Sequence, residues 1–362
     1  MKAAVITPGK KDTLRVIDVG RPELDEGDVL VRVLEAGVCG TDQELNSGVV
    51  GESPADGEFL IIGHENLGIV EEAGKSPDGL RKGDLVVATV RRPCRGLCFA
   101  CRNGEPDICA STDYFERGIK GMHGYMAEYY AERPENLIRV PLELRKTAVL
   151  LEPLSVVEKG VEQAFKIQER HIWNPRKALV AGAGTIGLLA GFILLDMGLE
   201  VWTFATRGRD SPKAQIAEAA GAHYVNVKEV SLERISKDYG PFDMVVEATG
   251  SSEIAFKAIG MVGNGGVVCL EGLSPKRAAH VICTDCINMD LVMGNKAVFG
   301  TVSSNRLHFE RGLARMESIE RRCPGLLERM ITRRVRLEEA RDALQHDRDD
   351  VKVVVEIGGL RR

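Results

Sequence analysis

The 362-residue sequence has no long apolar segment, no excess of positive charge and no internal repeat. No apolar run approaches the roughly 20 residues that a helix needs to cross a bilayer, so we expect no membrane segment. The N-terminal stretch MKAAVITPGKKDTLRV begins like a strand and continues as a charged turn, without the apolar core of a secretory signal. Both absences favour a cytoplasmic protein.

The balance of charge excludes further classes of partner. Lys and Arg number 48 and Asp and Glu number 53, which gives a formal net charge of −5. Nucleic acid and anionic membranes attract basic surfaces, so this mild acidity predicts neither as a partner. The chain is too long for a single hydrophobic core and is therefore expected to form two domains.

The residue pattern changes near the middle of the chain. Up to about residue 170, short β-type runs alternate with Gly, Pro and Asp, which predicts an all-β module; the clearest runs are Lys2–Thr7, Val29–Ala36, Gly68–Ala73 and Asp84–Val90. From Lys177 onward, strands and helices alternate. Six strands are predicted, at Lys177–Ala181, Glu200–Ala205, Tyr224–Val227, Asp243–Glu247, Gly266–Leu270 and Ala297–Gly300. Six is the number expected of a doubly wound parallel sheet.

The C-terminal segment beyond about Leu307 contains two helical patterns and one strand. The helices are expected around Arg311–Ser318 and Leu337–Leu344, and the strand at Val351–Ile357. Because the six-stranded sheet is already complete, we expect this last strand to return to the first domain.

A glycine motif lies between the first two strands of the second half. Gly182, Gly184 and Gly187, with Thr185 and Ile186 between them, lead from a strand into an apolar helix expected at Leu188–Met197. In this strand–glycine–helix–strand context the spacing is the dinucleotide-binding fingerprint. The glycines permit a tight turn, close approach to a pyrophosphate and close helix packing, and the pyrophosphate is expected on the helix N-terminus.

The next strand end lacks the carboxylate that usually binds the ribose diol of NAD. The corner reads Ala205-Thr206-Arg207-Gly208-Arg209, and the first acid is Asp210. Arginine binds phosphate through paired, charge-assisted hydrogen bonds, so two guanidinium groups here predict a preference for NADP. Two solvated surface arginines are the alternative interpretation.

Nine cysteines, an odd number, argue against a disulfide framework and for a reduced compartment. Four of them, Cys94, Cys98, Cys101 and Cys109, fall within 16 residues with C-x3-C-x2-C-x7-C spacing. Four thiolates in one loop can enclose a structural zinc ion; unrelated free thiols are the alternative. Cys283 and Cys286 also have C-x-x-C spacing, which we interpret as chance or packing because no second pair lies nearby.

A second set of residues has the chemistry of a catalytic zinc site. Cys39, His64, Glu65 and Glu152 each carry a group that binds zinc, and a catalytic site leaves one position open for water or substrate. Sequence spacing alone does not show that these side chains converge. A core cysteine and a Glu-Pro turn remain the simpler interpretations of the isolated residues.

Taken together, these motifs resemble those of the zinc-dependent medium-chain alcohol dehydrogenases. The resemblance rests on GVCGTD at 37–42, GHE at 63–65, the cysteine cluster, Glu152-Pro153 and AGAGTIG at 181–187. More narrowly, Gly121–Tyr129 and Leu151–Lys159 resemble the glucose 1-dehydrogenase branch, and the likeness covers nearly the whole chain.

The resemblance implies a GroES-like β domain at 1–165, with 303–362 returning to it, and a Rossmann domain at 166–302. It implies Cys39, His64, Glu65 and Glu152 as ligands of a catalytic zinc, and Thr41 and Glu152 as catalytic residues. Substrate-binding residues would be Thr41, Glu116, Glu152 and Ser303. Cofactor-binding residues would be Gly182, Gly184, Thr185, Ile186, Gly187, Thr206, Arg207, Gly208, Leu270, Glu271, Gly272, Thr301, Val302 and Ser303. His123 would support its loop and not bind metal.

The implied reaction is oxidation of an aldose, glucose or a close epimer, at C1 to the lactone with hydride transfer to NADP⁺, with NAD⁺ as a possible second coenzyme. Two features depart from the family pattern. The cysteine cluster has one extra residue among Arg95-Gly96-Leu97, and Gly294 and Ser303 lie near positions where relatives often carry His and Asn. The absence of His and Asn at these positions leaves the identity of the sugar undecided, because polar contacts determine which sugar hydroxyls an enzyme accepts.

Two alternatives to this function remain. One is a dehydrogenase of the same fold that acts on a polyol or another alcohol, and the other is a catalytically inactive NADPH-binding protein. We also expect a homo-oligomer, dimer or tetramer, because an exposed edge strand at Ala297–Gly300 could pair with a second chain.

Overall fold

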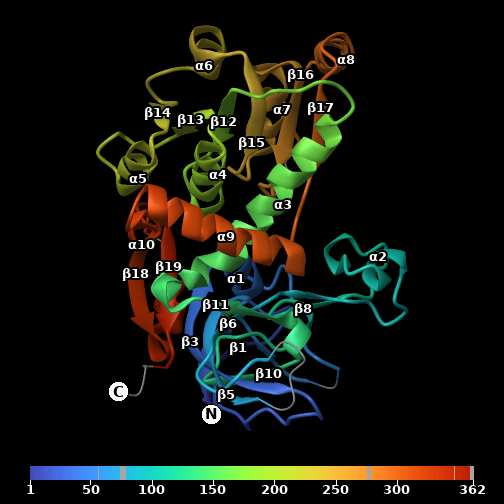
Figure 1. Cartoon of the computed structure of the whole chain (residues 1–362), viewed down its shortest axis with the longest axis vertical. Coiled ribbons are helices and arrows are strands. Elements are labelled where there is room, and N and C mark those ends of the chain that lie inside the picture. Colours follow the sequence, from blue (N-terminus) through green and yellow to red (C-terminus); the bar gives the residue numbers. More distant parts are fainter. Residues whose placement is uncertain (56, 74–78, 275–278, 346, 359–362) are drawn as a thin grey trace. The chain divides into compact units, whose positions relative to one another are not determined.

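The computed structural model describes residues 1–55, 57–73, 79–274, 279–345 and 347–358. The chain forms two compact units (Figure 1). The first comprises Met1–Ser155, Ser303–Met316 and Ile331–Arg362, and the second Val156–Val302 and Glu317–Met330. Two helices, α3 (Leu151–Gln168) and α9 (Arg306–Arg322), contribute residues to both units.

The first unit is built from three β-sheets. In the largest, the strand order is β11-β6-β5-β3-β19-β18, and β10 also pairs with β3. The strands are β3 (Val29–Val38), β5 (Glu65–Ala73), β6 (Leu85–Ala88), β10 (Tyr129–Glu132), β11 (Leu137–Val140), β18 (Ile331–Arg336) and β19 (Lys352–Glu356). The two small sheets have the orders β2-β1-β4 and β7-β8-β9; their strands are β1 (Lys2–Ile6), β2 (Arg15–Asp18), β4 (Leu60–Ile61), β7 (Arg91–Arg92), β8 (Phe115–Arg117) and β9 (Gly121–Met122).

Strand β3 is the centre of the large sheet. Nearly every residue of VLVRVLEAGV is buried, because side chains on both faces of the strand pack into core. The predicted run Val29–Ala36 is confirmed and continues to Val38. On one side β3 pairs with β5, and on the other with β19, the predicted C-terminal strand. Strand β18 was not predicted, because ITRRVR offers only a half-buried, arginine-rich alternation.

Helices in the first unit are short. They are α1 (Gly40–Asn46), α2 (Phe99–Arg102) and α11 (Ala340–Ala343), with 3-10 turns η1 (Pro106–Ile108), η2 (Pro134–Asn136), η3 (Leu142–Leu144), η4 (Ala148–Leu150) and η5 (Leu337–Glu339). The predicted helix Leu337–Leu344 forms as η5 followed by α11. The predicted helix Arg311–Ser318 lies within the longer α9.

The second unit contains a six-stranded parallel sheet in the order β14-β13-β12-β15-β16-β17, the doubly wound arrangement that was predicted. Its strands are β12 (Lys177–Ala181), β13 (Glu200–Ala205), β14 (His223–Asn226), β15 (Phe242–Glu247), β16 (Val262–Leu270) and β17 (Ala297–Gly300). Its helices are α4 (Thr185–Asp196), α5 (Pro212–Ala220), α6 (Leu232–Tyr239), α7 (Ser252–Met261), α8 (Thr284–Met293) and α10 (Leu326–Met330). All six predicted strands are present.

Helix α4 packs on β12 and β13. The predicted start at Leu188 was wrong by one turn, because Gly184 is the N-cap residue and Thr185 already has helical geometry. Its residues from Gly187 to Leu194 are all buried. A helix that is apolar on all sides belongs in a core, and here that core fixes the glycine turn preceding it.

A buried cluster of charges stabilises the first unit. The Glu132 Oε2 atom accepts hydrogen bonds from Arg92 at 2.5 Å and from Arg117 at 3.0 Å. Arg92 also donates to the Tyr125 hydroxyl, which in turn donates to the Thr89 carbonyl oxygen. Burial acts to raise the pKa of Glu132, but Arg92 and Arg117 outweigh it and lower this pKa to about 2. The cluster therefore explains why Tyr125, in the Gly121–Tyr129 motif, is completely buried.

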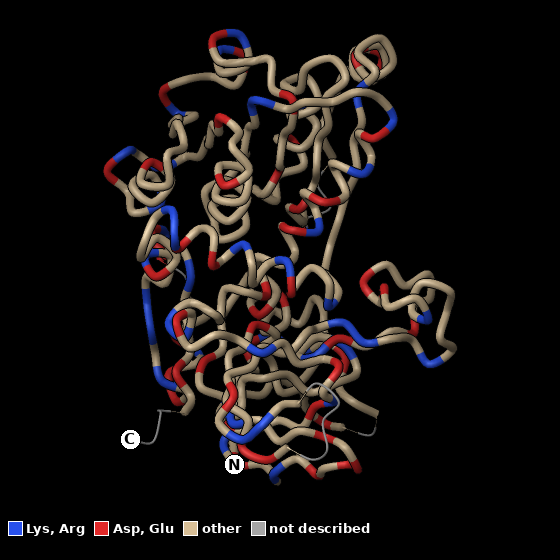
Figure 2. The backbone as a smooth tube through the Cα atoms, in the orientation of Figure 1, with Lys and Arg blue, Asp and Glu red and all other residues tan. Residues whose placement is uncertain are grey.

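Charges of both signs are interspersed along the chain (Figure 2). The most basic strand, β18, is balanced by acids: Arg334 pairs with Glu35 at 3.0 Å and Arg333 with Asp350 at 3.0 Å. Within the described residues, no helix is both long and apolar enough to traverse a membrane.

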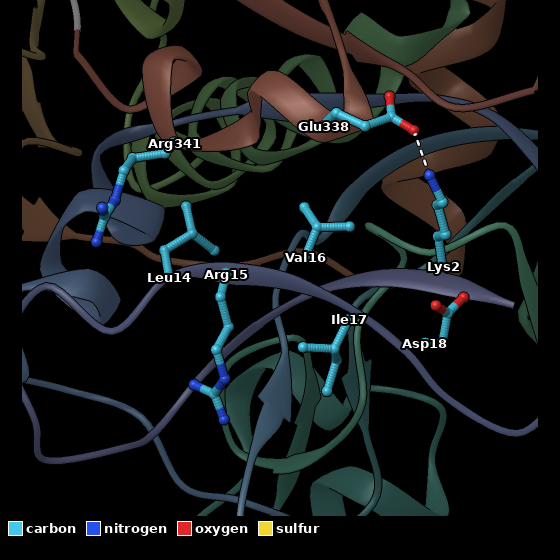
Figure 3. Close-up of a pocket in the computed structure, with 8 residues that line it drawn as sticks. All are labelled: Lys2, Leu14, Arg15, Val16, Ile17, Asp18, Glu338 and Arg341. Atoms are coloured by element: carbon cyan, nitrogen blue, oxygen red, sulfur yellow. Dashed lines mark hydrogen bonds and ion pairs between the residues drawn. The ribbon is translucent and has the colours of Figure 1, made fainter.

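A cavity of about 530 Å³ opens beside β2. Its lining consists of Lys2, Leu14, Arg15, Val16, Ile17, Asp18, Glu338 and Arg341, and Lys2 and Glu338 form an ion pair at 2.8 Å across it (Figure 3). It contains no predicted site residue.

We predict that Glu132→Gln lowers the free energy of unfolding of the first unit by about 3 kcal/mol at pH 7, because Arg92 loses its buried counter-ion. The folded pKa of Glu132 lies below its unfolded value. The stabilisation is therefore complete above about pH 4.5 and is lost as pH falls toward 2. Hydrogen exchange of the β3 and β10 amides measures the effect in this unit. The exposed Glu143→Gln is the control, and equal protection in wild type and Glu132→Gln at pH 7 would contradict the prediction.

Candidate active site

The ends of two strands bring Cys39 and His64 together. Cys39 follows β3 and is the N-cap of α1, while His64 immediately precedes β5. The Cys39 Sγ atom lies 3.2 Å from His64 Nε2, and with the Glu65 carboxylate these ligand atoms all lie within 4.8 Å of one another. Gly63, at φ +87°, makes the turn before His64, and a Cβ there would lie 2.9 Å from Met126. The convergence that spacing left open is therefore present.

Lys352 is a site residue that the sequence analysis missed. Its Nζ atom donates to both Glu65 oxygens, at 2.6 and 2.7 Å, and to the Val38 carbonyl oxygen at 3.1 Å. Gly37, opposite Glu65 in the sheet, leaves room for this pair, since a Cβ there would lie 1.9 Å from Glu65 Oε2. The available signal was a lysine within the apolar strand KVVVE.

Asp42 was also missed. Its Oδ2 atom accepts a hydrogen bond from the Cys39 backbone N–H at 3.0 Å, and its Oδ1 atom lies 4.0 Å from His64 Nδ1. Asp42 is completely buried, and neither Oδ1 nor His64 Nδ1 has a hydrogen-bond partner among the described residues. The carboxylate therefore faces the imidazole nitrogen that does not face Cys39. Its signal was the Asp three residues after Cys39, a helix-capping position.

Glu152, the second residue of α3, lies outside the group of three but interacts electrostatically with His64 and Glu65. Burial raises the pKa of Glu152 to about 7, opposed by His64. Burial acts to lower the pKa of His64, but Cys39, Asp42 and Glu152 together raise it well above its usual value. Thiol, imidazole and carboxylate groups therefore converge at a place that stabilises positive charge, and together they form the donor set of a zinc site.

Two other predicted residues of the first unit occupy different surroundings. Thr41 is half-buried at the second position of α1, two residues after Cys39. Glu116 lies on β8, where its Oε1 atom pairs with Arg91 at 2.7 Å, and the Arg91 guanidinium stacks on Tyr114 at 3.7 Å. One oxygen of Glu116 is therefore engaged by the protein itself.

The four cysteines of the loop also converge, with all four sulfur atoms within 4.8 Å of one another. Cys98 Sγ and Cys109 Sγ are 3.7 Å apart, close to the edge of about 3.8 Å expected for four sulfurs bound to one zinc. Backbone N–H groups of Cys101 and Ala110 lower the pKa of Cys98 to about 6, while burial raises that of Cys101 to about 12. The sulfur geometry fits a closed zinc site.

The extra residue in the cluster is accommodated by a turn. Leu97 donates its backbone N–H to the Cys94 carbonyl oxygen at 3.0 Å and has a positive φ of 43°. The side chain of Leu97 is exposed, so the added length bulges outward and leaves the sulfur positions intact.

The glycine motif has the geometry that its spacing predicts. Gly182 has φ +109°, and a Cβ on Gly187 would lie 2.1 Å from the Gly182 carbonyl oxygen. Gly184 is exposed, a Cβ there would meet nothing within 4 Å, and no side chain caps α4. The open N-terminus of α4, which begins with Thr185 and Ile186, fits a pyrophosphate.

The two arginines of the corner after β13 differ in their contacts. Arg209 donates to the Tyr224 carbonyl oxygen at 3.2 Å and lies 3.7 Å from Glu218. Arg207 is half-buried; its carbonyl oxygen accepts the Tyr224 hydroxyl, but its guanidinium forms no hydrogen bond or ion pair with the described residues. Thr206 is exposed beside it, and Ser211 closes the turn by donating to the Gly208 carbonyl oxygen. Arg207 is therefore the arginine available to a phosphate.

The remaining predicted coenzyme segments follow β16 and β17. Glu271 and Gly272, after Leu270, donate their backbone N–H groups to the Glu247 carbonyl oxygen. Burial raises the pKa of Glu271 to about 8, helped by Glu247. Thr301 donates its N–H to the Leu270 carbonyl oxygen, and Lys159 binds the Val302 carbonyl oxygen at 3.0 Å. Ser303 has a positive φ of 61°.

The structure also tests the predicted roles of His123 and of the Cys283/Cys286 pair. His123 accepts the Ile61 N–H at Nδ1 and stacks on Phe59, which confirms that it supports its loop. The interpretation of Cys283 and Cys286 as chance or packing was wrong, because the two form a disulfide. The first helical turn brings their Cα atoms to 5.2 Å, within bonding range.

Comparisons with known proteins match both halves of the chain. Residues 25–142 match the alcohol dehydrogenase GroES-like domain, and residues 145–357 match the glucose dehydrogenase C-terminus. The glucose 1-dehydrogenase of Methanocella arvoryzae is 72 % identical over 99 % of this chain and 100 % of its own, and that of Thermoproteus tenax 40 % identical over 99 % of both. The structure of Haloferax mediterranei glucose dehydrogenase with NADP, Zn and gluconolactone is similar with a TM-score of 0.91 at 32 % identity, over 99 % of this chain and 100 % of that chain.

We predict that the purified chain carries about two zinc ions and that Cys101→Ser retains about one, because a four-thiolate site loses its metal when one ligand is removed. Zinc per chain is measured by atomic emission after gel filtration. Cys323→Ser, which changes a cysteine outside both clusters, should keep two. One zinc in wild type and variant alike would rule out a metal at the four cysteines.

Proposed function

The chain belongs to the glucose dehydrogenase family of alcohol dehydrogenases with a GroES-like domain, and from this membership we propose which of its residues perform the family's reaction. The enzyme oxidises an aldose, glucose or a close epimer, at C1 to the aldonolactone and transfers the hydride to NADP⁺, with zinc as the metal cofactor. The observation that carries the assignment of residues is the 3.2 Å approach of Cys39 Sγ to His64 Nε2 beside buried carboxylates.

Cys39 and His64 would hold the catalytic zinc, with Glu65 and Glu152 as the carboxylates able to complete its ligand set. When bound, the metal supplies Lewis acidity that lowers the pKa of the sugar C1 hydroxyl. Asp42 holds the Cys39 backbone and faces the His64 Nδ1 atom, so it orients both ligands. Lys352 engages both Glu65 oxygens, which favours Glu152 over Glu65 as the carboxylate that changes its contacts during turnover.

Proton removal from the sugar would involve Thr41 and Glu152. The Thr41 hydroxyl is close in sequence to Cys39 and can accept the C1 proton and donate its own onward. The Glu152 carboxylate, buried beside His64, would take up or release that proton when it is not bound to the metal. Glu116, through the oxygen not paired with Arg91, and Ser303 would bind the other sugar hydroxyls.

Apart from Ser303, the residues proposed to hold the coenzyme belong to the second unit. NADP⁺ supplies the hydride acceptor. Gly182–Gly187 would receive its pyrophosphate on α4, and Thr206, Arg207 and Gly208 its 2′-phosphate. The segments Leu270–Gly272 and Thr301–Ser303 would bind the nicotinamide half through backbone groups and, at Glu271, a carboxyl that is largely protonated at pH 7.

This assignment divides the work between a GroES-like domain of residues 1–165 and 303–362 and a Rossmann domain of residues 166–302. A cytoplasmic location is consistent with the free thiols of the four-cysteine cluster. A homo-oligomer is consistent with β17, which is the edge strand of the six-stranded sheet.

We predict that Cys39→Ser or His64→Ala lowers kcat at least about a thousandfold, because loss of the Lewis acid removes several kcal/mol of transition-state stabilisation. Affinity for NADP⁺, measured by calorimetry, should change less than about twofold, since all the proposed coenzyme residues except Ser303 lie in the other unit. Cys323→Ser serves as the control for cysteine loss. Turnover and NADP⁺ binding lost together would overturn the proposed division of roles.

We predict that Arg207→Ala lowers kcat/KM for NADP⁺ by about 10- to 100-fold and changes that for NAD⁺ by less than about twofold, because only NADP⁺ carries the 2′-phosphate that a charged hydrogen bond stabilises. Arg209→Ala is the matched control and should have the smaller effect, since Arg209 is engaged by Glu218 and Tyr224. Initial rates followed at the nicotinamide absorbance with each coenzyme decide the matter. Equal losses with both coenzymes would remove Arg207 from the phosphate site.

A further inference from the structure

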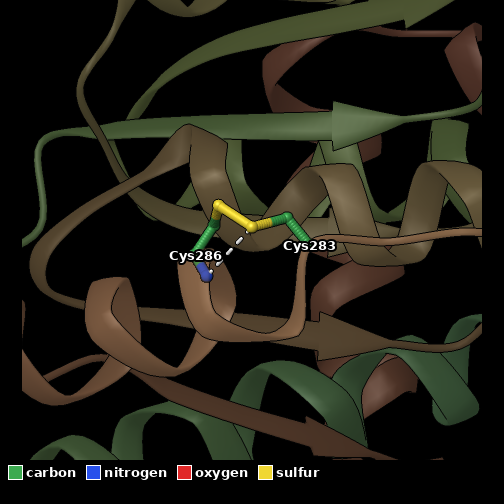
Figure 4. The surroundings of a disulfide bond; sticks show 2 residues. All are labelled: Cys283 and Cys286. Atoms are coloured by element: carbon green, nitrogen blue, oxygen red, sulfur yellow. Dashed lines mark hydrogen bonds between the residues drawn. A yellow bond between two sulfur atoms is a disulfide. The ribbon is translucent and has the colours of Figure 1, made fainter.

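One chemical feature has no place in sugar oxidation: the Cys283–Cys286 disulfide at the start of α8 (Figure 4). Both residues are exposed. Cys283 is the N-cap of α8, and its Sγ atom accepts the backbone N–H of Cys286 at 3.3 Å. The bond therefore joins the cap of a helix to its first turn, with both sulfur atoms on an exposed segment.

This disulfide adds little to the stability of the fold. It closes a loop of only four residues, and the entropy that a disulfide removes from the unfolded chain grows with loop length. Helix α8 contains no buried residue, and Met289, Val292 and Met293 on it are exposed. A bridge within such an element fastens nothing to the core, so stability does not account for it.

The position instead favours sulfur reactivity. A thiolate at a helix N-terminus is stabilised by the helix dipole and by the free N–H groups of the first turn. Cys283 occupies that position and already accepts one N–H, while Cys286 lies one turn further along. Asp285, in the same turn, opposes the effect, but it is exposed and its charge is screened by water. Of the two sulfur atoms, Cys283 Sγ is therefore the better nucleophile.

We propose that Cys283 and Cys286 form a reversible thiol–disulfide exchange site that reacts with low-molecular-weight thiols and disulfides of the glutathione class. In the oxidising direction, the Cys283 thiolate attacks a small disulfide RSSR, which forms a Cys283–SR bond and releases one RS⁻. The Cys286 thiolate then attacks Cys283 Sγ, which forms the intramolecular disulfide and releases the second RS⁻. Two electrons pass from the protein to RSSR, and the two protein thiol protons leave with the RS⁻ groups as RSH.

The reverse reaction uses two small thiols as reductant and restores both cysteines. Opening the bridge also frees the N-cap of α8 from its first turn. Because α8 has no buried residue and is held mainly by its contacts with α7 and by the Asp290–Lys296 ion pair, its first-turn amides lose protection from hydrogen exchange when the bridge is reduced. This site is independent of the sugar and coenzyme residues assigned above.

The first test is a redox titration of the zinc-loaded enzyme in buffers of reduced and oxidised glutathione, followed by differential alkylation and peptide mass spectrometry. Cys283 and Cys286 should change together along one two-electron curve that is the same in both directions, while Cys323 stays reduced or follows a separate curve. Hydrogen exchange over 284–293 should rise as the bridge opens. A bridge that never forms, or that cannot be re-formed after reduction, would overturn the proposal.

The second test assigns the attacking sulfur. Cys286→Ser should trap a mixed disulfide with glutathione at Cys283, formed about threefold or more faster than at Cys323, because Cys323 follows the C-terminal end of α9, where a thiolate is disfavoured. Cys283→Ser should react at Cys286 more slowly than that. Both variants should keep wild-type sugar dehydrogenase rates, which shows that they fold. If Cys283 reacts no faster than Cys323, the assignment of Cys283 fails.

Discussion

The register of three strands, β5, β3 and β19, is the constraint on which the catalytic centre depends. Gly37 of β3 lies opposite Glu65 of β5 on one side and Val354 of β19 on the other, and Val38 lies opposite Val353. This pairing places the end of β3, where Cys39 begins α1, beside His64, and it brings Lys352 from the far end of the chain to Glu65. A slip by one residue would turn every side chain of the slipped strand to the opposite face and separate these groups.

The same pairing explains how so much charge is tolerated in one buried place. Glu65 pairs with Lys352, one oxygen of Asp42 accepts the Cys39 backbone N–H, and Gly37 leaves the space that the Glu65 carboxylate occupies. The Glu152 carboxylate has no hydrogen-bond partner among the described residues, and burial raises its pKa to about 7. A cation held by Cys39 and His64 would offset the negative charge of Asp42 and Glu152, and its binding would then add to the stability of the site.

The four-cysteine cluster and the Cys283–Cys286 pair differ in their chemistry because their surroundings differ. The four cysteines from Cys94 to Cys109 lie in one loop, so a local turn decides their geometry, and Leu97 adjusts it without disturbing the sulfurs. Cys283 and Cys286 share one helical turn on an exposed helix, where nothing in the core depends on the bond between them. The first arrangement fits a closed metal site and the second fits exchange with small molecules.

Local pattern alone determined much of this protein. The six parallel strands, the glycine turn into α4 and the cysteine cluster could all be predicted, because each depends on residues that are neighbours in sequence. Strand β18 could not, because its arginines are stabilised by Glu35 and Asp350 and not by apolar burial. Only the tertiary structure decided that Cys39 meets His64, and that Lys352 and Asp42 lie beside them. It also decided that Arg209, and not the Arg207 guanidinium, pairs with other described residues. These contacts depend mainly on the pairing of segments that are distant in the sequence. The sequence states the chemistry of each side chain, but it does not state which side chain the folded sheet places beside it.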